Sequence, residues 1–293
     1  MKPLVRARLL MLVASTTWGT SFVVGRVGVS FLDPVVFAFL ENVIGMFVLA
    51  AGLKYQTREN SPRSGEHLLF VPKIVIVGVL NGLAYTCQYI ALSLTTAINT
   101  SLLVNISLPF VPLIAWALLK ERFAGRKAGG LVVGIAGAAL VATKGEIEQL
   151  TVGQFVGNLF AIGAGALWAF WIIVAQSALG QVHRPLRLAV GNAFYTVATL
   201  GIAVLVIGRI DPTQLAMPEP WLAMVYLGVM SIGVGYVVYY EALSQLGGSS
   251  SAAYILLQSA VALALAVLLL SEPLTLPVAV GAFMILVAIV TAG

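Results

Sequence analysis

Residues 85–93 of this 293-residue chain read YTCQYIALS, and residues 236–244 read YVVYYEALS. The match holds a constant offset of 151 and continues without a gap, so that twelve of the 49 positions 82–130 are identical to their partners. Glu121 and Glu272 are one of these pairs. A chance match of Leu and Ala would not repeat tyrosine, serine and glutamate at one offset. The chain is therefore predicted to consist of two related halves, residues 1–150 and 151–293.

The composition places the chain in a membrane. It is 60 % hydrophobic and 9 % charged, with a mean hydropathy of +1.02, whereas soluble domains carry about 25 % charged residues. An all-α integral membrane protein is predicted, with the lipid bilayer as its first partner. The formal net charge of +5 is better explained by basic cytoplasmic loops than by nucleic acid, so no nucleic-acid partner is expected. The first apolar run extends to Val24, which is too long for a signal-peptide core, and is interpreted as a retained span.

A spanning helix needs about 20 mostly apolar residues, and ten stretches qualify. The predicted spans are residues 9–25, 34–53, 72–93, 97–119, 127–143, 154–177, 187–207, 221–243, 250–270 and 275–292. Each half then holds five spans. Because five is odd, the fold expected is ten transmembrane helices arranged as two inverted five-helix repeats.

The basic residues give an independent test of this topology. With the N-terminus in the cytoplasm, thirteen of the sixteen Lys and Arg residues fall on the inner side, and only Arg26, Lys144 and Arg209 fall outside. This asymmetry follows the positive-inside rule. The prediction is a multi-pass protein of the cell (inner or plasma) membrane with both termini cytoplasmic.

Short motifs in both halves resemble a known family. The run Trp18-Gly19-Thr20-Ser21-Phe22 resembles the Trp-Gly opening of EamA-type carriers of the drug/metabolite transporter superfamily. QYIAL at 88–92, Thr96-Ala97, Pro109-Phe110 and LLKER at 118–122 are similar to the family's core motif. That motif is an aromatic–Ala–Leu run, a short turn, a span with a central proline and a terminal Glu. The second copy reads YEAL at 240–243, Gly248 and LLSEPL at 269–274. The resemblance covers essentially the whole chain.

Two positions depart from the family pattern. Members often carry a Leu-Arg pair in the second span, where this chain has Leu40-Glu41-Asn42, and Ala260 stands opposite Pro109 in the second copy. A charged residue inside a span is costly and is usually functional or paired. Glu41 is therefore the candidate for proton coupling or for contact with a substrate ammonium, against the alternative of an ion pair with Arg26. Glu241, near the inner end of the eighth span, is more readily an interfacial residue that reaches water.

Polar and aromatic residues recur at helical spacing inside the spans. Lipid cannot satisfy amides and hydroxyls, so these faces should turn inward, toward other helices or toward a wet cavity. The candidate cavity residues are Trp18, Asn42, Asn81, Tyr85, Gln88, Asn105, Trp168, Asn192, Tyr236, Tyr254 and Gln258. Pro109 and Pro112 are hinge candidates, although they could merely bend their helix.

The resemblance implies a secondary transporter that exports or exchanges a small metabolite by alternating access. Amides, hydroxyls, aromatic walls and one acid favour an amino acid or a related amphipathic solute, with a proton as a candidate coupling ion. One alternative is a multidrug or cation exporter of the same fold. Another is a membrane protein that is not a carrier, such as an intramembrane enzyme or a scaffold. The spans hold no histidine, and the chain has one cysteine, Cys87. No enzyme activity, metal or cofactor is therefore expected, and the oligomeric state is left open.

Overall fold

The computed structural model describes residues 3–59, 71–105, 108, 111, 114, 116–117, 125–143, 152–182 and 184–292. Within these residues the secondary structure is helical, without strands. The first half contributes α1 (Pro3–Gly28), α2 (Pro34–Glu59), α3 (Pro72–Leu94), α4 (Ala97–Asn105) and α6 (Gly125–Thr143). The second half contributes α7 (Val152–Val182), α8 (Pro185–Ile207), α9 (Pro212–Leu215), α10 (Pro218–Tyr226), the π-helix η4 (Leu227–Val234), α11 (Gly235–Leu246), α12 (Gly248–Leu270) and α13 (Leu276–Ala292).

Proline and cap residues set the helix starts. Pro34, Pro72 and Pro185 each open a helix, where the missing N–H would have no partner in any case. Asp33 adds a side-chain cap to α2, because its Oδ1 accepts hydrogen bonds from the backbone N–H groups of Val35 (3.0 Å) and Val36 (3.1 Å). Gly247, at φ +74, makes the turn between α11 and α12.

Each of the ten expected spans overlaps a helix of the structure. Within the described ranges, six helical stretches are long and apolar enough to cross a membrane: Pro3–Gly28, Pro34–Gln56, Pro72–Leu94, Gly153–Val182, Pro185–Ile207 and Pro218–Leu246. The all-helical membrane fold is confirmed to this extent, whereas the count of ten spans and the inversion of the halves remain predictions. The expected span 221–243 is not one regular α-helix, since η4 interrupts it between α10 and α11.

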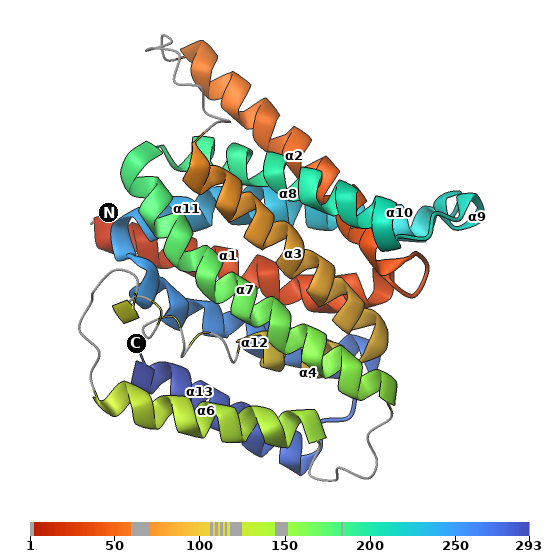
Figure 1. Ribbon diagram of the computed structural model, residues 1–293, viewed down its shortest axis with the longest axis vertical. Helices are drawn as coiled ribbons and strands as arrows, with labels where there is room; N and C mark the ends of the chain where they lie inside the picture. Colours follow the sequence, from red (N-terminus) through yellow and green to blue (C-terminus); the bar gives the residue numbers. More distant parts are fainter. Residues whose placement is uncertain are drawn as a thin grey trace.

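The helices of the two halves interleave. In Figure 1, α3, α7 and α8 lie beside one another, α1 passes behind them, and α6 and α13 form a separate pair. The N-terminal end of α1 and the C-terminal end of α13 lie at the same end of the molecule, on the left of Figure 1. We call this the N-terminal end. The α3–α4 turn lies at the opposite end.

A carboxylate from the second half caps α4. Glu272 follows the end of α12, and its two oxygens accept hydrogen bonds from the backbone N–H groups of Ala97 (2.8 Å) and Ile98 (3.0 Å). The positive end of the α4 dipole favours this negative charge. Ser271 takes a left-handed conformation (φ 54) at the end of α12, just before Glu272.

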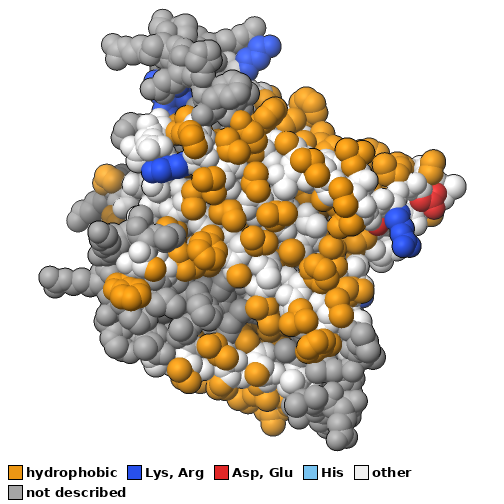
Figure 2. All heavy atoms as spheres, viewed as in Figure 1, with side chains coloured by type: hydrophobic (Ala, Val, Ile, Leu, Met, Phe, Trp, Pro, Cys, Tyr) orange, Lys and Arg blue, Asp and Glu red, His pale blue; other side chains and the backbone are white. Residues whose placement is uncertain are grey.

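The outer surface suits lipid. Figure 2 shows hydrophobic side chains spread across the visible face, with the charged side chains toward its margins. On α8, Leu205 is 87 % exposed and Val206 is 74 % exposed. An apolar surface of this extent is not expected on a soluble monomer and agrees with membrane insertion.

The α6–α13 pair is expected to depend on a glycine contact. A Cβ on Gly137 would lie 2.7 Å from the carbonyl oxygen of Gly281 and 2.8 Å from Cβ of Met284. Gly137→Val should therefore push the two helices apart and lower stability by about 1–3 kcal/mol, measured as the thermal unfolding midpoint in detergent. Gly129→Val is the matched control on the same helix, because nothing lies within 4 Å of a Cβ there. Equal midpoints for the two variants would contradict the prediction.

Candidate functional site

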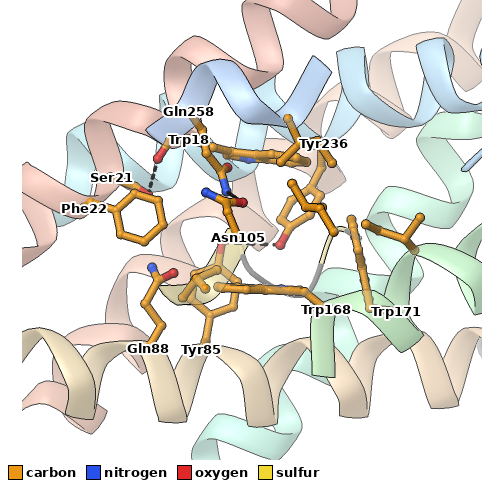
Figure 3. A pocket seen from close by; sticks show the side chains of 14 residues that line it. Trp18, Ser21, Phe22, Tyr85, Gln88, Asn105, Trp168, Trp171, Tyr236 and Gln258 are labelled. Carbon is orange, nitrogen blue, oxygen red and sulfur yellow. Dashed lines mark hydrogen bonds between the residues drawn. The ribbon is translucent and has the colours of Figure 1, made fainter. Parts of the chain in front are cut away.

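A small cavity lies among helices of both halves. Its volume is about 60 Å³, which is room for only a few water molecules. The labelled side chains converge on it from the surrounding helices (Figure 3). The lining residues are Trp18, Ser21, Phe22, Tyr85, Gln88, Val104, Asn105, Leu108, Trp168, Trp171, Ile172, Tyr236, Ile255 and Gln258. We call this the central cavity, and none of these lining residues carries a formal charge.

Aromatic rings form much of its wall. The ring of Trp18 meets Tyr236 edge-on at a centroid distance of 5.7 Å, and Trp171 meets Tyr236 at 5.8 Å. On the facing wall, Trp168 stands edge-on to Tyr85 at 5.7 Å. These are the favoured geometries for aromatic pairs. The rings therefore hold one another in place as a wall that is rigid and mostly apolar.

Asn81 organises this wall without lining the cavity. Its Oδ1 accepts hydrogen bonds from the hydroxyl of Tyr236 (2.9 Å) and from Nε1 of Trp168 (3.0 Å). Its Nδ2 donates to Oγ1 of Thr196 (3.0 Å), and the hydroxyls of Tyr236 and Tyr85 are 3.3 Å apart. One buried amide on α3 thus connects three helices of the second half and fixes two lining side chains.

Asn105 and Gln258 make a second cross-half contact. Nδ2 of Asn105 donates to Oγ of Ser259 (2.5 Å) and to the carbonyl oxygen of Ser101 (2.8 Å), and Nε2 of Gln258 donates to Oδ1 of Asn105 (2.7 Å). These bonds occupy both ends of the Asn105 amide. They also fix the orientation of Gln258 and leave its Oε1 available as an acceptor for a bound solute.

Glu41 is buried one layer away from the cavity. It is 1 % exposed, and its Oε2 accepts a hydrogen bond from the hydroxyl of Tyr89 (2.5 Å). The ring of Tyr89 stacks on Tyr85 at 6.2 Å, and Tyr85 lines the cavity. The alternative, an ion pair with Arg26, is not formed, and Nη1 of Arg26 instead donates to the carbonyl oxygen of Leu92 (2.7 Å). Glu41 is not among the described residues that line the central cavity.

Most of the predicted cavity residues meet at one place. Seven of the eleven line the central cavity: Trp18, Tyr85, Gln88, Asn105, Trp168, Tyr236 and Gln258. The other four do not. Asn81 is the organiser described above, Asn42 hydrogen-bonds to Ala38 and Glu41, Asn192 accepts from Nε1 of Trp171 (3.3 Å), and Tyr254 packs against the core. Pro109, Pro112 and Glu121 lie outside the described residues.

The apolar part of the lining could not be predicted from the sequence. Phe22, Val104, Leu108, Ile172 and Ile255 line the cavity, but an apolar residue in a span looks the same whether it faces lipid or a cavity. The π-helix was also missed. It brings the carbonyl oxygen of Ser231 to 3.0 Å from Nε1 of Trp18, and π-helical turns are frequent at functional sites.

Comparison with known proteins identifies the family. The sequence profile of the EamA-like transporter family matches residues 5–143 and again residues 155–292. The chain belongs to the EamA-like transporter family. This EamA-like protein is 30 % identical over 252 residues to an uncharacterized transporter of Archaeoglobus fulgidus, covering 86 % of this chain and 85 % of that one. It is 24 % identical to the uncharacterized transporter YvbV of Bacillus subtilis, over 98 % of this chain and 91 % of the relative.

More distant similarities agree. A WAT1-related protein of Arabidopsis thaliana is 24 % identical over 76 % of this chain and 71 % of its own length. A solved crystal structure superposes with a TM-score of 0.68 over 98 % of this chain and 96 % of that one, at 19 % identity, which shows the fold. The resemblance seen in the sequence is confirmed. This EamA-like chain is a multi-pass membrane transporter and not an enzyme.

Proposed function

We propose that this transporter is a secondary carrier that exports a small metabolite by alternating access, with the central cavity as its cargo site. The observation that supports this most directly is the composition of the cavity wall. Helices α1, α3 and α4 of the first half and α7, α11 and α12 of the second all contribute to it. A site between two repeats that can move against each other is the usual location in secondary transporters.

The cargo we favour is an amino acid or a related amphipathic solute. The cavity offers aromatic faces for an apolar side chain, with the amides of Gln88 and Gln258 and the hydroxyl of Ser21 for polar groups. A cavity of about 60 Å³ is smaller than such a solute, so binding requires the rings to move apart.

An organic cation is the second candidate cargo. Trp18, Tyr85, Trp168, Trp171 and Tyr236 surround the cavity, and aromatic faces attract ammonium groups through cation–π interactions. The described residues of the lining include no cationic side chain to neutralise a free carboxylate, which favours this candidate over a strongly acidic cargo.

The remaining parts of the proposal concern coupling and placement. We infer proton coupling through Glu41, which is the one buried carboxylate among the described residues and is connected to the cavity wall by way of Tyr89 and Tyr85. We further infer ten spans in two inverted halves, with both termini in the cytoplasm of a cell-membrane protein. The thirteen-to-three asymmetry of basic residues supports this orientation.

Counterflow into proteoliposomes tests the cargo. A panel of radiolabelled amino acids and organic cations should include solutes that accumulate in vesicles preloaded with the same unlabelled solute. Gln258→Leu should raise the half-saturating concentration of that cargo about tenfold, because a lost hydrogen bond in a dry site costs about 1–2 kcal/mol. Tyr254→Phe, a change outside the cavity in the same helix, should leave it unchanged. Absence of counterflow with every solute, or equal effects of the two variants, would count against the cavity as the cargo site.

A further inference from the structure

A larger cavity lies at the N-terminal end of the molecule. Its volume is about 510 Å³, and it opens between the ends of α7 and α11 and the start of α8. Gln176 and Gly180 line it from α7, Pro185 from α8, and Glu241 and Ser244 from α11. We call this cavity the vestibule. The proposed orientation places it on the cytoplasmic side.

Glu241 is the one residue with a formal charge among the described residues that line the vestibule. Oε1 of Glu241 lies 3.8 Å from Nη2 of Arg6, and the two side chains are 33 % and 58 % exposed. Nε2 of Gln245 approaches the same oxygen at 3.5 Å. An ion pair this long and this exposed contributes little. The carboxylate therefore remains available to a cation that enters the vestibule.

The helix ends around the vestibule are of both kinds, because α7 and α11 end there and α8 and α12 begin there. Helices α7 and α11 end there at Val182 and Leu246, and helix C-termini carry partial negative charge. Helix α12 begins there, but the backbone N–H of Gly248 already donates to Oε1 of Gln176 (2.9 Å). The amide group that would otherwise attract an anion is thus occupied. Arg184 and Arg187 lie near the start of α8 and act in the opposite sense, although neither lines the vestibule.

One aromatic layer separates the vestibule from the central cavity. Along α11, Tyr236 lines the central cavity and Ser244 lines the vestibule, with Tyr239 and Tyr240 between them. Trp171 stacks on Tyr239 at 5.2 Å and contacts Tyr240 at 5.8 Å. The hydroxyls of both tyrosines are buried without a hydrogen-bond partner. Buried hydroxyls without partners are rare, and here they lie in the layer that a solute must cross.

We propose that the vestibule is a binding site for a protonated amine or another small organic cation, held by the carboxylate of Glu241. Its role as the place where cargo binds first rests on the proposed transport function. The cation site itself does not depend on transport. The carboxylate of Glu241 makes the vestibule attractive to positive charge and unattractive to anions.

Charge-selective thiol labelling tests this without knowledge of the cargo. In a Cys87→Ala background, which removes the one native thiol, Ser244→Cys introduces a thiol in the vestibule wall. The protein in nanodiscs, with both faces accessible, is treated with a cationic methanethiosulfonate (ethylammonium) or an anionic one (ethylsulfonate). Glu241→Gln should lower the ratio of the labelling rate with the cationic reagent to that with the anionic reagent about fivefold. High salt should lower the same ratio in the protein that retains Glu241, because screening weakens the attraction of the carboxylate for the cationic reagent. Propylammonium chloride should slow labelling more than sodium propionate does.

Matched controls make the result decisive. Glu219→Gln makes the same change at an exposed carboxylate at the start of α10 and should leave the ratio unchanged. Gly180→Cys provides a second thiol position, because nothing lies within 4 Å of a Cβ there. A ratio that Glu241→Gln does not lower at either position, or that Glu219→Gln lowers equally, overturns the proposal. Equal protection by propylammonium and propionate also overturns it. A cation-selective vestibule in a protein that moves no solute would instead reject the transport proposal alone.

Discussion

Glu41→Gln should abolish the response of transport to an imposed pH gradient. Glu41 lies inside α2 with its side chain 1 % exposed, and the hydroxyl of Tyr89 is its close partner at 2.5 Å. Arg26, the nearest candidate for a counter-charge in the sequence, is engaged by the carbonyl oxygen of Leu92. A carboxylate buried without a cationic partner is costly, so a proton is the cation best placed to neutralise it. The glutamine side chain keeps the shape and cannot take up that proton.

The measurement is cargo uptake into proteoliposomes with and without a pH gradient. Counterflow driven by cargo alone should persist in Glu41→Gln, which separates loss of coupling from loss of folding. Tyr89→Phe keeps the carboxylate and should keep the pH response. Glu219→Gln makes the same change at an exposed carboxylate at the start of α10 and should also keep it. Gradient-driven uptake by Glu41→Gln at the wild-type level would remove the assigned role.

Asn81→Leu should lower both transport and stability more than any single change in the cavity wall. The leucine has a similar volume but leaves the hydroxyl of Tyr236 and Nε1 of Trp168 without their acceptor. A buried donor without a partner costs about 1–3 kcal/mol, which is the loss expected for Nε1 of Trp168 and corresponds to about a tenfold change. The hydroxyl of Tyr236 keeps only its 3.3 Å contact with the hydroxyl of Tyr85. The rings of Tyr236 and Trp168 would also lose the bonds that fix their orientation.

A double-mutant cycle distinguishes this positioning role from general damage. Tyr236→Phe removes one of the donors, so its effect and that of Asn81→Leu should not add. Counterflow rate and the thermal unfolding midpoint are measured for both single variants and for the double variant. Additive effects on both quantities would mean that Asn81 and Tyr236 act independently, contrary to the geometry.

The sequence predicted the chemistry of the site better than its geometry. Asn81, Tyr85 and Gln88 share a helix face by their spacing, and the structure buries all three. Helical spacing does not say which of them contacts the cavity, and Asn81 turned to Tyr236 and Trp168 instead. Trp171 lies three residues after Trp168 and could have been assigned to the same face.

The π-helical segment η4 could not be predicted from the sequence. The η4 segment, LGVMSIGV, is apolar apart from Ser231, and nothing in such a run marks where an α-helix widens. The interaction that places Trp18 is also nonlocal, because its acceptor is a backbone carbonyl 213 residues away. By contrast, the starts of α2 and α3 at Pro34 and Pro72 agree with the expected spans 34–53 and 72–93, whereas α8 begins at Pro185, two residues before its expected span. Proline favours a helix start locally and independently of the fold.

The cap that Glu272 places on α4 carries a thermodynamic consequence for any conformational cycle. Its two hydrogen bonds join the start of α4 in one half to the end of α12 in the other, and hydrogen bonds to a charged group contribute about 1.5–3 kcal/mol each. Separating the halves at this end of the molecule would forfeit that free energy and leave the opened conformer a minor population. Differential binding of cargo to the opened conformer must then make up the deficit. Glu272 would in this way set the difference in ligand affinity between the two conformers that is needed to populate the opened one.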